Sequence, residues 1–256
     1  MKIHHLRNAT MVIESNDKVI LVDPMLGAKG TAGPSFTLFR YKPKRNPILD
    51  LPANAMDIIN KTTHCLITHL HPDHLDTYAE TLLKTKSTPV ICSVKDEKTL
   101  RKRGLNVTQV VDYWKSSEFL GGTIEGIPAV HGYRFIVKLM GNVMGFYIQL
   151  PDEKSIYISA DTIYTDDVHK VLSDYKPDIS VVASGRAQLD LFQPLLMKME
   201  DIVRFINNAP DMVIANHLEA VNHCPITREE LALELTNRGL IEKTIIPADG
   251  QIMEFN

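Results

Sequence analysis

The chain has 256 residues, enough for one large α/β domain or two small ones, and 44% of them are apolar. Its formal net charge of −3 provides no broad basic field, which argues against a nucleic-acid partner and against binding to a membrane surface. No apolar run approaches the roughly 20 residues that span a bilayer, and the first residues lack a secretory signal core. Three widely spaced cysteines argue against a disulfide framework, so we expect a cytoplasmic protein.

The first 22 residues predict an antiparallel meander. Short apolar runs alternate with polar residues, and the break at residues 15–18, Ser-Asn-Asp-Lys, has turn chemistry. Asp23 and Pro24 end this section.

Residues 25–52 lose periodicity and gain four prolines and three glycines. A loop of this length inside a compact domain is often functional. Two interpretations stay open: a solvated flap without a ligand, or a lid that contacts an anionic or ring-bearing substrate. The side chains that favour a lid are Phe36, Phe39, Arg40, Tyr41, Lys42, Lys44 and Arg45.

The rest of the chain alternates between βα units and strand-rich sections. We expect strands at 64–67, 89–92, 107–111, 117–120, 123–130, 135–140, 145–150, 155–159, 179–182 and 212–215. Helices are expected at 75–84, 96–103, 165–172 and 199–207, and a last helix opens with a capping box at Thr227 and ends at Gly239. The order suggests two similar halves, with paired sheets inside and helices outside. We expect a single domain over residues 1–256.

A histidine-rich loop directly follows the predicted strand at 64–67. Residues 68–74 read Thr-His-Leu-His-Pro-Asp-His and place His69, His71, Asp73 and His74 before the next helix. Imidazole is the commonest metal ligand in proteins, and nitrogen and oxygen donors of this kind suit zinc. The simpler alternative is a polar surface loop, but the spacing favours two adjacent divalent ions.

Three later residues occupy the same position, just past a predicted strand end: His131, Asp161 and His217. A single histidine there is more often a hydrogen-bonded structural residue, but three together indicate a shared site. The prediction places His69, His71 and His131 on a first ion and Asp73, His74 and His217 on a second. Asp161 bridges the two ions, because a carboxylate offers two oxygens.

Other residues compete for roles in this site. His223 lies six residues after His217 and is an alternative last ligand, although His217 follows the apolar strand directly. Cys224 is a soft ligand, a reactive thiol or a buried inert cysteine. Asp23 and Asp249 either hold ligand imidazoles from outside the metal shell or form turns.

The ligand order resembles the metallo-β-lactamase superfamily, whose signature is H-x-H-x-D-H followed by a later His, Asp and His. The resemblance covers essentially the whole chain and implies the superfamily's four-layered αβ/βα sandwich, with two mixed sheets face to face. The length and the early Asn8-Ala9-Thr10 look most like the group of ascorbate-6-phosphate lactonases. The secreted lactamases usually carry a Cys where Asp161 stands, and the flavodiiron branch has a Glu at the position of His71.

This site predicts a metal-dependent hydrolase with two zinc ions per chain, for which manganese or iron are alternatives. Zinc lowers the pKa of a bridging water toward roughly 7, and the hydroxide attacks a small ester or lactone, with or without a phosphate. Asp73 orients the nucleophile and passes its proton to the leaving group. The rivals are a phosphodiesterase acting on a nucleotide or lipid, and a metal-binding protein without catalysis. The sequence leaves the oligomeric state open and allows a homo-oligomer.

Overall fold

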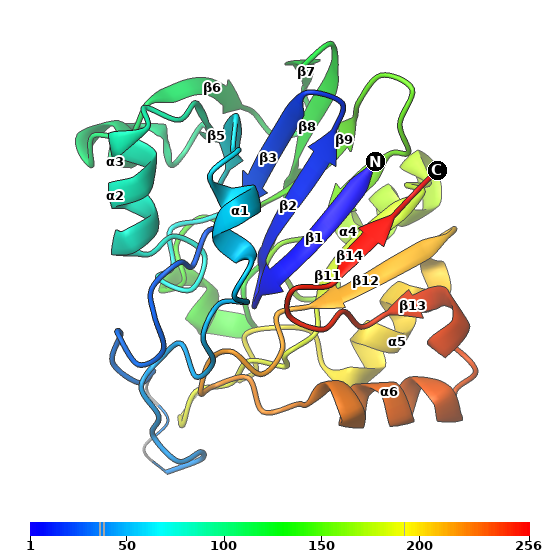
Figure 1. Cartoon of the computed structure of the whole chain (residues 1–256). Helices are drawn as coiled ribbons and strands as arrows, with labels where there is room; N and C mark the ends of the chain where they lie inside the picture. Colours follow the sequence, from blue (N-terminus) through cyan, green and yellow to red (C-terminus); the bar gives the residue numbers. More distant parts are fainter. Residues whose placement is uncertain (36, 38, 192) are drawn as a thin grey trace.

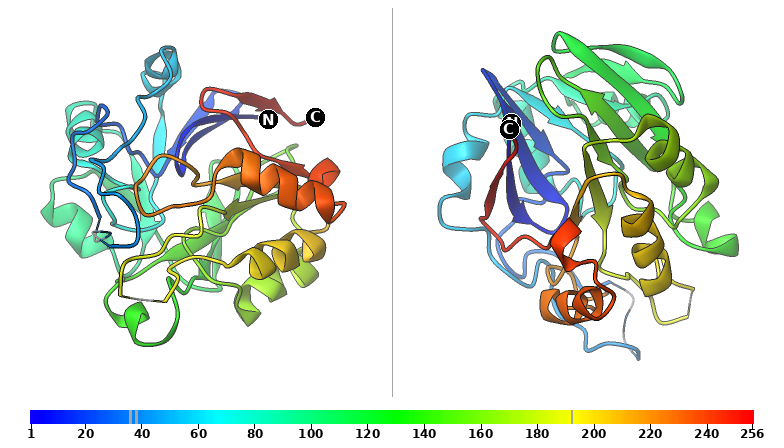
Figure 2. Two further views of the ribbon diagram at one scale, coloured as in Figure 1. Left: turned by 90° about the horizontal axis from the view of Figure 1, so that it is seen from below. Right: turned by 90° about the vertical axis from the view of Figure 1, so that its right-hand side faces the viewer.

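Two seven-stranded sheets pack face to face in the computed structural model, with helices on their outer faces (Figure 1, Figure 2). The structure describes residues 1–35, 37, 39–191 and 193–256, so Phe36 of the expected lid lies outside the described residues. The predicted αβ/βα sandwich with two mixed sheets is confirmed.

The first sheet has the order β14-β1-β2-β3-β4-β5-β6. Its antiparallel part is the predicted meander, and its parallel part alternates with helices, as expected for βα units. The strands are β1 (Lys2–Arg7), β2 (Thr10–Ser15), β3 (Lys18–Val22), β4 (His64–Leu66), β5 (Val90–Ser93), β6 (Val107–Val111) and β14 (Ile252–Glu254). The helices are α1 (Ala55–Ile59), α2 (Thr77–Thr85) and α3 (Glu97–Lys102).

The second sheet has the order β13-β12-β11-β10-β9-β8-β7. Strands β10 to β13 are parallel to one another, and β7 to β10 form an antiparallel meander. The strands are β7 (Ser116–Phe119), β8 (Gly122–Pro128), β9 (Met144–Gln149), β10 (Ile156–Ile158), β11 (Ile179–Ala183), β12 (Met212–Asn216) and β13 (Thr244–Ile245). The helices are α4 (Asp166–Lys170), continued by a π turn (Val171–Tyr175), α5 (Met199–Asn208), α6 (Arg228–Asn237) and a 3-10 turn (Ile241–Lys243).

The main core lies between the sheets. Ile13 and Leu66 of the first sheet belong to the same buried cluster as Phe146 and Ile214 of the second. Burying one such side chain contributes about 2 kcal/mol, so this shared layer strongly favours the packed sheets. Smaller clusters fill the space between each sheet and its helices.

The structure corrects two local predictions and adds two elements. Residues 135–140 are not a strand: Arg134–Lys138 form a 3-10 helix, because β8 pairs directly with β9 and leaves no sheet position for them. Helix α2 begins at Thr77 rather than at residue 75, since the Asp76 side chain caps it by accepting from the amide of Ala79. Helix α1 and strand β14 were not predicted.

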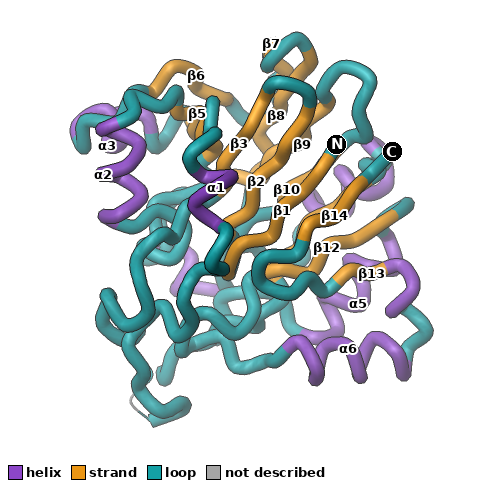
Figure 3. Tube along the Cα trace, viewed as in Figure 1, coloured by secondary structure: helices purple, strands orange, loops and turns teal. Residues whose placement is uncertain are grey.

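The long connections gather at one end of the sandwich (Figure 3). Among them is the segment 25–52, in which the described residues form no helix or strand and Ala32 makes one isolated bridge with Asn46. Helices α5 and α6 have ten residues each, and none of the described helices combines the length and apolarity needed to cross a bilayer.

Candidate metal centre

Strand ends place the candidate ligands at one end of the sandwich. The histidine-rich loop connects β4 to α2, while His131, Asp161 and His217 follow β8, β10 and β12 of the opposite sheet. Since β8, β10 and β12 run in the same direction, their carboxyl ends meet at one edge. The structure brings all seven predicted residues together in three overlapping groups whose ligand atoms lie within 4.8 Å of one another.

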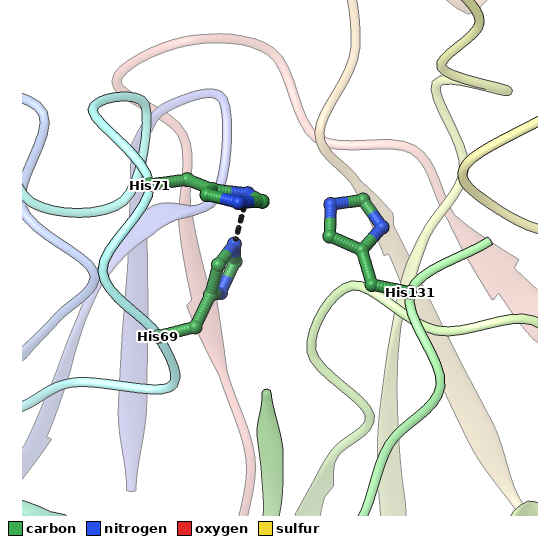
Figure 4. A group of neighbouring side chains, drawn as sticks. All are labelled: His69, His71 and His131. Carbon is green, nitrogen blue, oxygen red and sulfur yellow. Dashed lines mark hydrogen bonds between the residues drawn. The ribbon is translucent and has the colours of Figure 1, made fainter. Parts of the chain in front are cut away.

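The first group consists of His69, His71 and His131. Nε2 of His69 lies 3.1 Å from Nδ1 of His71. His131 comes from the opposite sheet and faces this pair across the space between them (Figure 4). The group therefore forms only when the two halves of the chain pack together.

The second group consists of Asp73, His74 and His217. Nε2 of His217 lies 3.1 Å from Nε2 of His74 and 3.2 Å from Oδ2 of Asp73. Asp161 lies between the two groups: its Oδ1 is 3.3 Å from Nε2 of His74, and its Oδ2 is 3.5 Å from Nε2 of His131. This is the central position that the sequence predicted for the carboxylate.

Asp23 organises the imidazoles of the motif without joining the groups. Its Oδ2 accepts from Nδ1 of His74 at 2.9 Å and from the hydroxyl of Thr68 at 2.6 Å, and its Oδ1 accepts from the Thr68 amide at 2.8 Å. Because the Thr68 hydroxyl donates to Asp23, its oxygen is left to accept from Nδ1 of His69 at 3.0 Å. This network assigns the Nδ1 protons, so the Nε2 lone pairs of neutral His69 and His74 point into the site.

The two histidines of the second sheet are oriented in the same way. Nδ1 of His131 donates to the carbonyl oxygen of Leu195 at 2.9 Å, and Nδ1 of His217 lies 3.4 Å from Sγ of Cys224. Cys224 is therefore a buried neighbour of a candidate ligand. Both imidazoles present Nε2 to the other candidate ligands.

These residues fit a bound cation. In the neutral tautomers set by the outer partners, the Nε2 lone pairs of His74 and His217 face each other at 3.1 Å and would repel. Oδ1 of Asp161 is buried and has no hydrogen-bond partner among the described residues. A divalent cation bound by Nε2 of His74 and of His217 would remove this repulsion, and it would offer the buried carboxylate a positive partner.

The two groups differ in their protonation. Burial and neighbouring imidazoles lower the pKa of His69 well below its usual value, and burial lowers the pKa of His131 to about 4. In contrast, three carboxylates outweigh burial and raise the pKa of His74 to about 10, and Asp161 raises the pKa of His217 well above its usual value. Without a metal, the second group therefore holds protons that a cation must displace.

The same imidazoles act on the carboxylates. Burial alone would raise the pKa of Asp161, but His217, His74 and His131 outweigh it and lower this pKa well below the usual range. For Asp73, His74 and His217 likewise outweigh burial and lower the pKa. Both carboxylates are therefore ionised and suited to bind cations.

Asn8 is a site residue to which the sequence analysis assigned no role. It lies in the β1–β2 turn at a left-handed φ of 57°, which Asn tolerates better than most residues. Its side-chain Nδ2 donates to the carbonyl oxygen of Asp73 at 3.2 Å and lies 3.4 Å from Nε2 of His217. An Asn in a tight turn was the available signal, but turns of this kind are common.

The residues considered as alternative ligands lie outside the three groups. None of the three groups found among the described residues contains His223 or Cys224. Asp249 pairs with Arg228 and lies 3.4 Å from Nε2 of His5, so it does not hold a ligand imidazole. Of Asp23 and Asp249, only Asp23 makes a hydrogen bond to a candidate ligand imidazole, that of His74.

The segment 25–52 is anchored at both of its ends. The fully buried guanidinium of Arg7 donates to the carbonyl oxygens of Met25, Gly27 and Leu49. Near the middle, Asn46 and Asn222 exchange hydrogen bonds of 2.8 and 2.9 Å, which ties the segment to the loop that follows His217. These hydrogen bonds hold the segment against the rest of the chain at its ends and near its middle.

A groove of about 410 Å³ adjoins the first group. Its wall includes Ala129, two residues before His131, and Val143, which makes a β-bridge with His69. Tyr113 and Lys95 form another part of the wall, with the ammonium 4.7 Å from the ring centre. The volume is that of a site for a small molecule.

Several known proteins are similar to this chain in sequence and in fold. Residues 18–217 match the family model described as a β-lactamase superfamily domain. The chain is 32% identical to the UPF0173 protein YddR of Bacillus subtilis and 25% identical to a UPF0173 metal-dependent hydrolase of Flavobacterium johnsoniae, each over the full length of both chains. It is 31% identical to the crystal structure of an isothiocyanate hydrolase from Delia radicum gut bacteria, with a TM-score of 0.87, covering 100% of this chain and 99% of the other.

Proposed function

This chain belongs to the β-lactamase superfamily and is a metal-dependent hydrolase, and from this premise we propose that two divalent ions act together in its site. The observation that carries the proposal is the convergence of imidazole lone pairs and carboxylate oxygens at 3.1 to 3.6 Å. His69, His71 and His131 would hold one ion and Asp73, His74 and His217 the other. Asp161 would contact both.

The donor set favours zinc over manganese or iron. Five imidazole nitrogens contribute to the three groups, and imidazole suits zinc better than it suits the harder magnesium and calcium ions. When bound, the ions would supply a hydroxide near neutral pH and polarise the atom that accepts negative charge. The side chains around the ions would then determine which substrate binds and how it is oriented.

We propose that the substrate is a small ester or lactone, as in the lactonase-like group that the sequence resembles. The groove whose wall includes Ala129 and Val143, the bridge partner of His69, has the volume of a small molecule and is the site that we propose for the substrate. Two cations that could have bound a phosphate are engaged elsewhere: Arg40 donates to the carbonyl oxygens of residues 189 and 190, and Arg45 to those of residues 30 and 31. Lys95 in the groove wall is a cation that would face an anionic group of the substrate, so the phosphorylated lactone stays in the substrate panel.

Within the site, we propose that Asp73 orients the attacking water. Its side chain retains some exposure toward solvent, whereas those of His74 and His217 are buried. One carboxylate oxygen faces His217, so the other is the one available to accept a hydrogen bond from the water.

An isothiocyanate is the second candidate substrate. The supporting observation is the 31% identity over the whole chain to the isothiocyanate hydrolase from Delia radicum gut bacteria. An isothiocyanate, like an ester, presents a small electrophilic carbon to a nucleophile. Both candidates therefore require a nucleophilic water, which would add across the C=N bond of an isothiocyanate to give a thiocarbamic acid and would displace the alkoxide of an ester.

A substrate panel with metal analysis tests the function. The zinc-loaded protein is assayed with a simple lactone, an aryl ester, an aryl isothiocyanate, a sugar-phosphate lactone and a bis-aryl phosphodiester. We expect turnover of a carbon-centred substrate and loss of both metal and turnover in His69→Ala and Asp73→Ala. His64→Ala, at the far end of β4, is the matched control and should retain both.

The results of this panel distinguish the proposed hydrolase from a phosphodiesterase and from a metal-binding protein without catalysis. Turnover of the phosphodiester alone would replace the proposal by a phosphodiesterase. Bound metal without turnover of any of the five compounds would favour a non-catalytic metal protein. Unchanged metal content in both alanine variants would show that the assigned donors are wrong.

A further inference from the structure

Lys95 carries the only charged side chain among the described residues that line the groove of about 410 Å³. It lies in the connection between β5 and α3, and its side chain is exposed. The rest of the lining is neutral and consists of Tyr113, Pro128, Ala129, Gly141, Asn142 and Val143. A groove of this size with one cation in its wall has the chemistry of a site for a small molecule that carries an anion.

We propose that this groove binds an anionic group of the substrate, a carboxylate or a phosphate, and that Lys95 selects for it. The inference rests on the proposed hydrolytic function and deepens it, because it names the substrate class. It also places the cationic contact on the connection between β5 and α3 and not in the segment 25–52.

The ring of Tyr113 holds the Lys95 ammonium at the groove, with 4.7 Å between the nitrogen and the ring centre. A cation over a ring face is attracted by the ring, which restrains an otherwise mobile side chain. The backbone amide of Lys95 donates to the Ser93 hydroxyl at 3.0 Å, so the main chain is fixed as well. An ammonium has three donor hydrogens, and those that do not face the ring can donate to an anion in the groove.

Tyr113 is itself fixed by hydrogen bonds. Its main chain makes a parallel bridge with β8, and its hydroxyl donates to Oδ1 of Asn142. Nδ2 of Asn142 donates to the Ser93 hydroxyl and to Oδ2 of Asp96, each at 2.7 Å. The aromatic side of the groove is therefore preorganised, and only the ammonium has donors to spare.

The carboxylates closest in sequence to the groove have other partners. Asp96 is buried, accepts from Asn142 and is not among the lining residues. Asp112 pairs with Lys115 at 2.6 Å, and Glu97 pairs with Arg101 at 2.9 Å. None of the described carboxylates forms an ion pair with the ammonium in the groove wall, so its charge is available to a ligand.

Two residues of the groove wall are main-chain neighbours of candidate metal ligands. Val143 forms a β-bridge with His69, which places their Cα atoms about 5 Å apart. Ala129 lies two residues before His131, so their Cα atoms are at most about 7 Å apart. A substrate held in the groove by its anionic end can therefore extend its carbonyl group toward the first ligand group.

A set of matched esters tests the proposal. The substrates are the nitrophenyl monoester of adipic acid, its methyl ester and the nitrophenyl ester of phosphonopentanoic acid, which differ only in the terminal group. They are assayed with the zinc-loaded wild type, Lys95→Met and Lys95→Arg. Lys98→Met is the matched control, because Lys98 is an exposed lysine of α3 outside the groove wall.

The quantity compared is kcat/KM of a charged ester divided by kcat/KM of the neutral ester. We expect this ratio to fall about tenfold in Lys95→Met, through a higher KM for the charged ester, because a charge-assisted hydrogen bond is lost. Lys95→Arg keeps the charge and should stay within about threefold of the wild type. A fall for only one charged ester supports the proposal and identifies the anion. An unchanged ratio for both esters in Lys95→Met, or an equal fall in Lys98→Met, overturns it.

A binding measurement separates this proposal from the proposed hydrolysis. Trp114 is the only tryptophan of the chain and directly follows Tyr113, so its fluorescence reports on the groove. The monoanilide of adipic acid and its methyl ester, which carry an amide in place of the reactive ester, are titrated into the same four zinc-loaded proteins. Relative to the neutral anilide, the charged one should bind Lys95→Met about tenfold more weakly than it binds Lys98→Met.

The two proposals can then fail independently. If no ester is turned over but the charged anilide still depends on Lys95, the hydrolysis is wrong and the groove is supported. If the esters are turned over and neither the esters nor the anilides depend on Lys95, the groove proposal alone is wrong.

Discussion

Replacing Asp23 by Asn isolates the carboxylate that orients the motif histidines. Asp23 is buried and accepts three hydrogen bonds, two from Thr68 and one from His74. It has a left-handed φ of 46°, a conformation that Asn adopts readily, so the substitution adds little backbone strain. What changes is the replacement of one acceptor oxygen by an NH₂ donor.

The expected loss follows from the three donors. If the new NH₂ replaces Oδ2, the Thr68 hydroxyl and the His74 N–H both lose their acceptor; if the amide flips, the Thr68 amide loses its own. One or two buried donors left unpaired cost about 1–3 kcal/mol each, so we expect the free energy of unfolding to fall by about 2–4 kcal/mol. Because Nδ1 of His74 is no longer held, the affinity for metal should fall about 10–100-fold.

The assay is a zinc titration of the metal-free protein against a chromophoric chelator, together with denaturant unfolding. Asp178→Asn is the matched control, because Asp178 accepts from the amide and the hydroxyl of Ser155 and does not belong to the metal groups. It should lose stability and keep wild-type zinc affinity. Wild-type zinc affinity in Asp23→Asn would refute the reasoning that the outer carboxylate tunes the ligands.

Three further predictions concern packing, the segment 25–52 and pH. Gly185→Ala should destabilise by about 1–3 kcal/mol in denaturant unfolding, because its Cβ would overlap the carbonyl oxygen of His217, whereas Gly33→Ala, with no heavy atom within 4 Å, should be neutral. Arg7→Met leaves three backbone carbonyls without a donor, so we expect a loss of about 3 kcal/mol and faster limited proteolysis within residues 25–52; an unchanged cleavage rate would contradict the anchoring role. In the metal-free protein, the pKa of His74 is raised from 6.5 to about 10, so its stabilising contribution is fully present below pH 6.5 and is lost as the pH rises through about 10. Unfolding in a chelator near neutral pH and near pH 10 should show this fall, and the zinc-loaded protein should show much less of it.

The ligand positions could be predicted because they depend on local patterns. His69, His71, Asp73 and His74 follow one apolar strand, and His131 and His217 follow two others, so the common edge of the sheets brings them together. The alternation of strands and helices predicted paired sheets inside and helices outside, and the resemblance to the metallo-β-lactamase superfamily implied the four-layered sandwich. These features need no knowledge of side-chain geometry.

Asp23 was predicted as one of two outer candidates, but the choice between Asp23 and Asp249, and the partner of His131, depend on distant parts of the chain and could not be predicted. Asp23 lies 51 residues before His74, and Leu195 lies 64 residues after His131. The 3-10 helix at Arg134–Lys138 was predicted as a strand since apolar residues there resemble one, and only the pairing of β8 with β9 excludes it. Strand β14 was missed because its three residues depend on β1 for pairing.

The ties between Asn222 and the segment 25–52 have a consequence for engineering substrate choice. Thr37 and Asn46 of that segment bind the residue next to His223, and Ile48 donates to the carbonyl oxygen of Ala220. If residues 25–52 alone were replaced by those of a relative, the new segment would lack the matching hydrogen-bond acceptors on Ala220 and Asn222. The mismatch would disturb the loop that follows His217. A chimera made to exchange specificity is therefore expected to fold only when residues 25–52 and 218–224 are transferred as one cassette.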